Sequence, residues 1–292
     1  MVYSDSELIL HPDGSIYHLN LLPEHVTPIV FTVGDPDRVG EVSKHFDKIE
    51  IQRHHREFVT HVGKLRGQRV MVVSTGIGTD NIDIVMTELD ALVNIDFTTR
   101  KVKTELTPLS IFRIGTSGSI QTDIDVDTLV VSTMAVGLDN LMHFYDASQQ
   151  PNEFDLADQL ADYLESKSED LVLMPYVFSA DKKLLQLFEK EQFTKGITVT
   201  SPGFYAPQGR ILRGASTEPN LVKLLNAFKM KNASLTNFEM ETAGIYGMAR
   251  LLGHQAVSIS VILANRMTGR FSENPQQAVE KMIEQVLNIV IP

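Results

Sequence analysis

Hydrophobic and polar positions alternate along this chain between short apolar runs and longer amphipathic segments. One run begins at Ser110 and passes through Arg113 into Gly115-Thr116-Ser117-Gly118, which predicts a buried strand that ends in a tight polar turn. Two alternating runs flank Arg66-Gly67 and indicate a hairpin. Further apolar runs predict buried strands at 28–33, 127–137, 171–178, 195–201 and 255–264.

Helical patterns and helix start signals fill most of the intervals between these strands. Helices are predicted from the Gly34-Asp35-Pro36 turn to residue 46, from the loop 74–81 to about 93, and at 154–164, 181–193, 242–252 and 275–290. The expected caps are Asp35 or Asp37, Ser179, Gly253 and Asn274. The segments 94–108 and 138–151 are polar, and we expect a surface excursion and a loop there.

Strands and helices alternate without an internal repeat or a linker rich in Gly, Ser or Pro. We therefore expect an α/β fold with a mixed central β-sheet flanked by helices, in a single domain that spans residues 1–292. The length of 292 residues is compatible with one large domain.

Composition narrows the class of protein. The net charge of −11 argues against nonspecific binding to nucleic acid, because phosphate neutralisation requires a basic face. The chain has no cysteine, which excludes disulfides, thiolate nucleophiles and cysteine-ligated metals. We expect no membrane association, because no apolar run approaches the ~18–20 residues of a membrane span. A cytoplasmic enzyme is the expected class.

Two places could hold a small anion. Arg113, followed by hydroxyl groups between glycines, offers a planar fork of donors and backbone N–H groups. Gly34-Asp35-Pro36 opens a helix directly after a strand, and Arg38 lies in its first turn. For each place, an ordinary turn with a surface arginine is an equally good interpretation. The loop 74–81 lacks the Gly-Lys-Ser/Thr ending and the third glycine of nucleotide-binding loops, which disfavours ATP and NAD.

Two further motifs could recognise an organic ligand. Gln208 and Arg210 lie one residue apart, and on extended chain they would point the same way and match the edge of a heterocycle such as uracil. Glu239 and Glu241 precede a helix, where they could accept hydrogen bonds from a sugar diol or simply favour the helix dipole. A solvent loop is the alternative for Gln208 and Arg210. The adjacent histidines His54 and His55 lack zinc-site spacing.

Six short motifs occur in order along the chain: Gly34-Asp35-Pro36-x-Arg38, Arg56-Glu57-Phe58, Ser74-Thr75-Gly76-Ile77-Gly78, Arg113-Ile114-Gly115-Thr116, Gln208-x-Arg210 and Phe238-Glu239-Met240-Glu241. Together they resemble the hexameric nucleoside phosphorylase family, from about His18 to Arg266. The Gln208-x-Arg210 motif resembles the uridine-cleaving branch of that family rather than the purine branch.

The resemblance implies a nucleoside phosphorylase/hydrolase-like fold and phosphorolysis of uridine to uracil and ribose 1-phosphate. The residues implied to bind phosphate are Gly34, Arg38, Arg56, Arg113 and Thr116. Those implied to bind the nucleoside are His18, Thr116, Phe204, Gln208, Arg210, Phe238, Met240 and Glu241. The residues implied to take part in catalysis are Arg113, Glu241, Gln208 and Arg210.

The same resemblance implies a homo-oligomer, dimer-based or hexameric, because Arg56 and His18 would serve a neighbouring subunit. Phosphate would be a co-substrate, and no organic cofactor is implied. Glu57 would help to place a potassium ion between subunits, although Asn81 stands where the family usually has serine, and Phe238 where tyrosine is common. Three alternatives stay open: a purine nucleoside phosphorylase, a nucleosidase of the same fold, and a non-catalytic nucleoside-binding protein.

Overall fold

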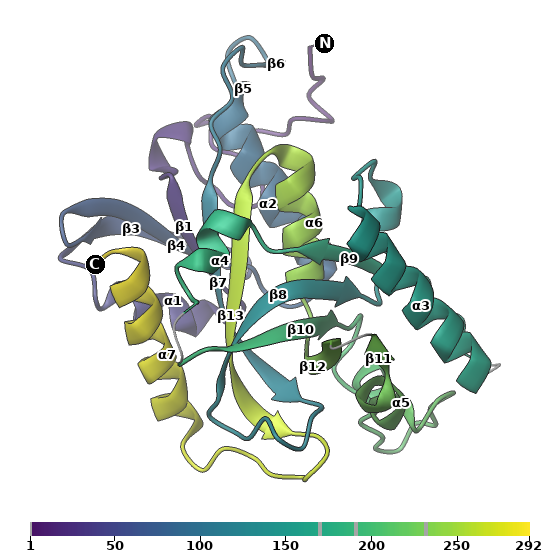
Figure 1. Ribbon diagram of the computed structural model, residues 1–292. Helices are drawn as coiled ribbons and strands as arrows, with labels where there is room; N and C mark the ends of the chain where they lie inside the picture. Colours follow the sequence, from purple (N-terminus) through teal and green to yellow (C-terminus); the bar gives the residue numbers. More distant parts are fainter. Residues whose placement is uncertain (1, 169–170, 190–191, 231–232) are drawn as a thin grey trace.

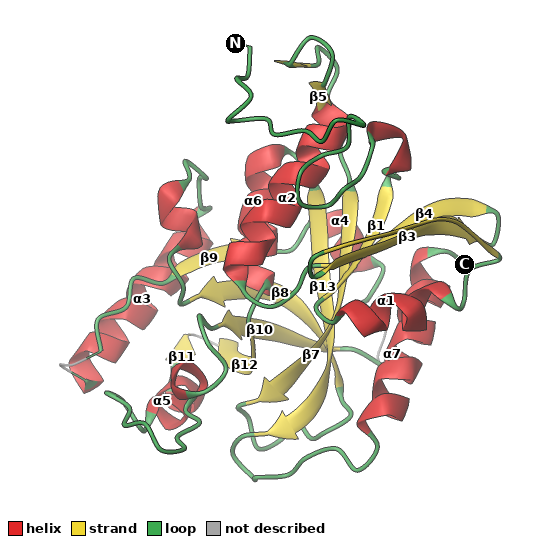
Figure 2. Cartoon of the chain, turned by 180° about the vertical axis from the view of Figure 1, so that it is seen from behind, coloured by secondary structure: helices red, strands yellow, loops and turns green. Residues whose placement is uncertain are grey.

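The computed structural model describes residues 2–168, 171–189, 192–230 and 233–292 of the chain. The protein is built on one large mixed β-sheet (Figures 1 and 2). The sheet has eleven strands in the order β11-β12-β10-β8-β13-β7-β1-β4-β3-β2, and β9 pairs with β8. The strands are β1 Ile29–Val33, β2 Lys48–His55, β3 Phe58–Leu65, β4 Gln68–Ser74, β7 Ser110–Ser119, β8 Leu129–Gly137, β9 Tyr176–Ser179, β10 Thr194–Thr200, β11 Lys229–Met230, β12 Ala233–Glu239 and β13 Gln255–Asn265.

Helices lie on both sides of this sheet. They are α1 Pro36–Ser43, α2 Thr79–Asn94, α3 Pro151–Lys167, α4 Lys182–Gln186, α5 Leu221–Ala227, α6 Thr242–Leu252 and α7 Pro275–Val290, with short 3₁₀ turns at Pro23–His25, Leu141–Phe144 and Ala206–Gln208. Helices α2 and α6 pack against each other in front of the sheet in Figure 2. Helix α3 lies over a smaller apolar cluster that it shares with α5 (Figure 1).

Part of the sheet closes on itself. β7 pairs in parallel with β13 along its length and antiparallel with β12 at its end, so that β12, β10, β8, β13 and β7 form a continuous ring. These observations confirm the predicted fold class, an α/β fold with a mixed central sheet flanked by helices. No described helix is long and apolar enough to cross a membrane.

The segment 110–118 differs from its prediction. β7 runs without a break from Ser110 to Ser119, so the predicted turn at Gly115-Thr116-Ser117-Gly118 is wrong. The backbone stays extended because β13 pairs with β7 from Ser110 to Ser119, and β12 adds a second partner at Gly118. Gly115 serves close packing rather than a turn, because a Cβ there would lie 1.8 Å from Nη1 of Arg113.

Further elements differ from their predicted bounds. The strand expected at 171–178 begins only at Tyr176, because Pro175 has no N–H for the ladder. The helix expected at 181–193 covers only Lys182–Gln186, its cap is Asp181 rather than Ser179, and residues 190–191 lie outside the described chain. Asp35 caps α1 and Gly253 ends α6 with a left-handed φ of 78°, as predicted. Helix α1 ends at Ser43 rather than at residue 46, and α3 extends beyond the predicted 154–164 at both ends.

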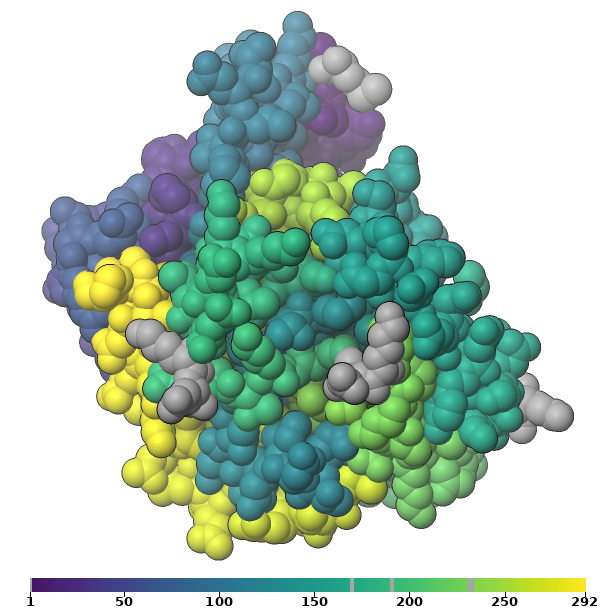
Figure 3. All heavy atoms as spheres, viewed as in Figure 1, coloured from purple at the N-terminus to yellow at the C-terminus, as the bar shows by residue number. Residues whose placement is uncertain are grey.

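The segment 94–108 forms the predicted surface excursion. It contains a two-stranded sheet of β5 Ile95–Asp96 and β6 Lys101–Val102, separate from the main sheet. Figure 3 shows this part standing above the rest of the surface, beside the N-terminal segment. None of its residues lines the cavity described below.

Candidate active site

One cavity of about 690 Å³ gathers most of the sequence-predicted site residues. Its size is within the usual range for a small-molecule site. It is lined by the segments that follow β1, β10 and β12 and by residues within β7, so residues far apart in sequence meet there. The predicted residues that line it are Gly34, Arg38, Glu57, Arg113, Thr116, Phe204, Gln208, Arg210, Phe238, Met240 and Glu241.

Arg113 is a buried cation on the cavity wall. Its Nη2 lies 2.5 Å from Oε2 of Glu241 and 3.0 Å from Oε2 of Glu239, and its side chain is 6% exposed. Burial lowers the pKa of Arg113, but the two carboxylates outweigh burial and raise it, so the group is a permanent cation. Its Nη1 has no hydrogen-bond partner among the described residues. Arg113 therefore retains donor capacity for a further anionic ligand.

Arg38 adds a second cation at the same end of the cavity. It belongs to the first turn of α1, whose N-terminus is fixed by the Asp35 side chain accepting from the N–H of Asp37 at 3.0 Å. Burial lowers the pKa of Arg38, and the nearby charge of Arg113 lowers it further, while Asp35 opposes the shift. Two guanidinium groups that repel each other across a helix N-terminus form a favourable site for an anion.

Two carboxylates, Glu239 and Glu241, also line the cavity. Glu241 accepts a hydrogen bond from the N–H of Gly78 at 2.8 Å, and burial raises the pKa of Glu241 despite the opposing charge of Arg113. The charge of Glu239 raises the pKa of Glu241 as well. Glu241 stands just before α6, and its other oxygen faces Arg113. A carboxylate held in this way can accept hydrogen bonds from hydroxyl groups.

Arg210 is a third cationic side chain that lines the cavity. Arg210 stacks on Phe204 with 3.8 Å from its Cζ to the ring centroid, and its Nη1 donates to Oε1 of Gln208 at 2.8 Å. Burial and the neighbouring charge of Arg266 lower the pKa of Arg210 to about 10. Arg266 also donates to the backbone oxygen of Gln208 at 3.0 Å and so anchors this loop.

Gln208 and Arg210 come together by a different route from the one predicted. The chain between them is not extended: Ala206–Gln208 is a 3₁₀ turn, and Gly209 adopts a left-handed φ of 67°. This turn brings the two side chains into contact, whereas simple alternation on a strand would have placed them in parallel without contact. The two side chains nevertheless line the same cavity as Arg113.

Apolar side chains cover the rest of the cavity. Phe238 is 1% exposed and Phe271 is 62% exposed, and both line the cavity together with Leu263 and Ala264. A planar heterocycle could pack against such a wall while its polar edge meets Gln208 and Arg210.

Arg56 and His18 are the two predicted site residues that do not line this cavity. Arg56 is exposed in the turn after β2, where its guanidinium lies 5.3 Å from the ring centroid of Tyr17. Nδ1 of His18 lies 2.7 Å from Oε1 of Glu88, which also accepts from the backbone N–H of His18. Both residues belong to neighbouring segments, because Nδ1 of His55 contacts the backbone oxygen of His18.

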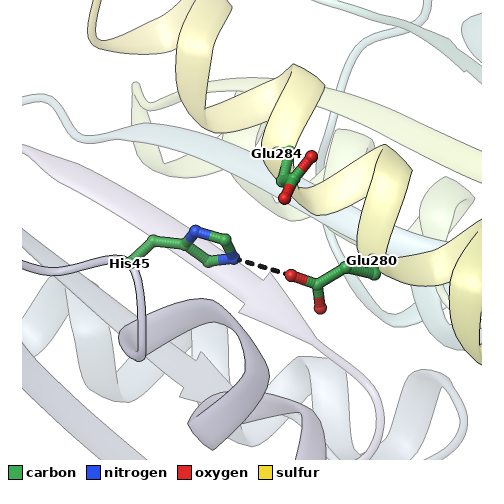
Figure 4. Close-up of side chains that lie close together, drawn as sticks. All are labelled: His45, Glu280 and Glu284. Carbon is green, nitrogen blue, oxygen red and sulfur yellow. Dashed lines mark hydrogen bonds and ion pairs between the residues drawn. The ribbon is translucent and has the colours of Figure 1, made fainter.

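Glu57 is exposed at the cavity edge, beside Gly76 and Asn81. Among the described residues, the side chains grouped closely enough to share a metal ion lie elsewhere, at His45, Glu280 and Glu284 (Figure 4). Glu280 already pairs with Lys44 at 2.5 Å and with His45 at 3.1 Å. These ion pairs account for the grouping without a metal.

The fold and the cavity together define a class of protein. A closed ring of strands within a mixed sheet supports a cavity lined by arginine side chains and by two carboxylates. The chain belongs to the phosphorylase superfamily, whose family model matches residues 28–291.

Individual nucleoside phosphorylases are also similar to the chain. The chain is 30% identical to the uridine phosphorylase of Thermococcus kodakarensis over 95% of this chain and 87% of that protein. It is 27% identical to the DeoD-type purine nucleoside phosphorylase of Hahella chejuensis, over 94% and 98% of the two chains. A crystal structure of a Trypanosoma brucei nucleoside phosphorylase, reported to show uridine phosphorylase activity, superposes with a TM-score of 0.86 at 27% identity, over 97% and 99% of the two chains.

Sequence reasoning gave no role to two residues that contact the predicted set. Arg266 closes β13 at the cavity, and its position directly after a buried strand was the signal that could have identified it. Gly78 supplies the N–H that holds Glu241, from the glycine-rich loop that opens α2. That loop therefore approaches a side chain of the site rather than a nucleotide.

Proposed function

We propose that this protein cleaves uridine by phosphorolysis, giving uracil and ribose 1-phosphate. The observation that supports this proposal is that one cavity is lined by three sets of polar groups: Arg38 with Arg113, Glu241, and Arg210 with Gln208. An inorganic phosphate, a ribose and a pyrimidine carry groups complementary to these three sets. The similarity to uridine phosphorylases supports the same assignment.

The chemistry follows from where charge develops. As the glycosidic bond breaks, positive charge grows on the ribose and negative charge grows on the departing uracil. Phosphate held by Arg38 and Arg113 is the nucleophile, and Glu241 accepts a ribose hydroxyl. Arg210 stabilises the uracil anion, because Gln208 and the backbone oxygen of Phe204 occupy only some of its five N–H donors. Such stabilisation lowers the barrier because it strengthens as charge develops.

A panel of nucleosides, each incubated with and without phosphate, tests this proposal. Free base is measured by chromatography. We expect uracil release from uridine only when phosphate is present, with ribose 1-phosphate as the second product. Base release without phosphate would indicate a nucleosidase, and binding of uridine without any release would indicate a binding protein.

Purine phosphorolysis is the main alternative, since one relative is a purine nucleoside phosphorylase. In the purine branch an acidic side chain commonly follows the apolar part of this strand, which here ends at Ala264. The next residue here is Asn265, the last residue of β13, and its side chain is hydrogen-bonded to the backbone: its Nδ2 donates to the oxygens of Gln121 and Ile124, both at 2.9 Å. Its Oδ1 accepts from the N–H groups of Met267 and Thr268. Asn265 therefore has no free group for a purine base, which favours the pyrimidine.

We also propose that the working protein is a homo-oligomer in which Arg56 and His18 complete a neighbouring subunit's cavity. Both residues lie outside the cavity of their own chain, and Arg56 is exposed. Analytical ultracentrifugation combined with activity at increasing dilution tests this. We expect activity to fall as the subunits separate, and full activity in the dissociated monomer would refute the proposal.

A potassium ion near Glu57 is proposed as an accessory to that assembly. Glu57 and Asn81 offer oxygen ligands at the cavity edge, which suit a hard cation. Replacing potassium with tetramethylammonium at constant ionic strength should lower activity or weaken subunit association. Equal activity and equal association in both salts would exclude a role for the cation.

A further inference from the structure

Glu239 is a buried carboxylate of the cavity to which the proposed reaction assigns no role. It is the last residue of β12, and its side chain is 2% exposed. Its Oε2 accepts from the N–H of Glu241 at 3.0 Å and from the N–H of Thr242 at 2.9 Å. The hydroxyl of Thr242 donates to the same oxygen at 2.8 Å, and the hydroxyl of Thr200 donates to Oε1 at 2.5 Å.

These contacts use most of the acceptor capacity of Glu239. Each carboxylate oxygen has about two lone-pair positions. Oε2 takes three of the four hydrogen bonds and the 3.0 Å contact with Nη2 of Arg113, so it has no free position, while Oε1 accepts from Thr200. Glu241 accepts only from Gly78 and Arg113 among the described residues and keeps free positions. The two carboxylates flanking Met240 therefore differ: each oxygen of Glu241 has one partner, whereas the Glu239 oxygen that faces Arg113 is fully occupied.

The partners of Glu239 come from separate elements. Arg113 lies on β7, Thr200 ends β10, and Thr242 begins α6. These partners are also linked to one another, because the Thr200 hydroxyl accepts from the N–H of Ala243 at 2.9 Å. Glu239 thus connects the cation at the phosphate end of the cavity to the helix N-terminus that presents Glu241.

We propose that Glu239 is a positioning residue that fixes the Arg113 guanidinium, so that phosphate is bound in register with the nucleoside. This role rests on the proposed phosphorolysis, in which Arg113 binds phosphate. Groups that act in catalysis must be held within narrow limits, and buried partners supply that restraint. Glu239 acts through Arg113 and does not itself touch the substrate.

The matched pair Glu239→Gln and Glu153→Gln tests this role. Glu153 is an equally buried carboxylate that accepts from Arg250 at 2.8 Å and from the backbone N–H groups of Gln150 and Ser179, at a site remote from the cavity. Both variants lose comparable interactions, so thermal unfolding should show similar losses. Only Glu239→Gln should raise KM for phosphate and lower kcat, by about ten- to a hundredfold in kcat/KM, which is the size expected for lost charge-assisted hydrogen bonds.

A second comparison separates positioning from contact with the substrate. In an Arg113→Ala background, Glu239→Gln should change kcat/KM less than twofold, because the residue through which it acts is gone. Additive losses would refute the proposal. A loss with uridine that disappears with 2′-deoxyuridine would also refute it, because that result would place Glu239 on the ribose hydroxyl.

Phosphate binding measured by calorimetry without nucleoside gives a readout independent of turnover. We expect Glu239→Gln to weaken it and Glu153→Gln to leave it unchanged. Wild-type protein that cleaves no nucleoside would defeat the proposed function, whereas active wild type with unchanged phosphate affinity in Glu239→Gln would defeat only the role of Glu239. If Glu239→Gln does not fold, Thr200→Val serves instead, because it removes the hydroxyl that donates to Glu239 and should also raise KM for phosphate. An unchanged KM for phosphate in Thr200→Val would refute the positioning role of Glu239.

Discussion

Gly115→Ala is the substitution for which the structure makes the most specific prediction. An added Cβ would lie 1.8 Å from Nη1, 2.6 Å from Cζ and 3.0 Å from Nη2 of Arg113. Gly115 has no positive φ, so the change adds no backbone strain. The guanidinium must therefore move, and it can move only by leaving Glu239 and Glu241, which are 2% and 7% exposed.

Breaking such a buried ion pair costs about 3–5 kcal/mol of folding free energy. We expect Gly115→Ala to lose about that much in chemical denaturation and to raise KM for phosphate by about a hundredfold. The control is Gly40→Ala in α1, where a Cβ meets nothing within 4 Å and should stabilise the helix by about 0.5–1 kcal/mol. Wild-type stability and phosphate KM in Gly115→Ala would refute the assigned packing of Arg113.

Three other outcomes follow from the structure. Thr60→Val should leave stability unchanged or raise it by about 1 kcal/mol in thermal unfolding, because the buried Thr60 hydroxyl has no partner among the described residues; a clear loss would reveal a hidden partner. Phe204→Ala should raise KM for uridine about three- to fivefold, because Arg210 loses the ring on which it stacks, and should leave KM for phosphate unchanged. Equal changes in the two KM values would argue against separate binding sites for uridine and phosphate within the cavity. The pKa of Glu241 is raised above its ordinary value of 4.5, so kcat/KM should rise with pH as this carboxyl group ionises. The free energy of unfolding should fall over the same pH range, because the folded state disfavours the charged form. Glu241→Gln should remove the rise in kcat/KM from a pH–rate profile.

The sequence was sufficient where the local signal and the tertiary structure agree. Asp35 caps α1, Gly253 ends α6, and the apolar run from Gln255 forms a strand, because each depends on neighbouring residues alone. The motif residues Arg38, Arg113 and Arg210 likewise line one cavity.

The sequence was insufficient where distant strands decide the local conformation. The glycines after Arg113 read as a turn, yet pairing with β13 and β12 keeps this segment extended. Gln208 and Arg210 were expected to alternate on extended chain, but the left-handed Gly209 brings them into contact. The restraint on Arg113 by Glu239 could not be predicted either, because it depends on a register between β7 and β12 that no local pattern encodes.

The position of β13 has a consequence for how the chain is made. This strand, Gln255–Asn265, lies between β7 and β8, which precede it by more than a hundred residues. Until it is synthesised, both of those strands lack their shared partner and expose unpaired edges. Because such long-range pairing is slow, we expect the nascent protein to depend on chaperones, and truncation before residue 255 to give an aggregating product rather than a smaller folded unit.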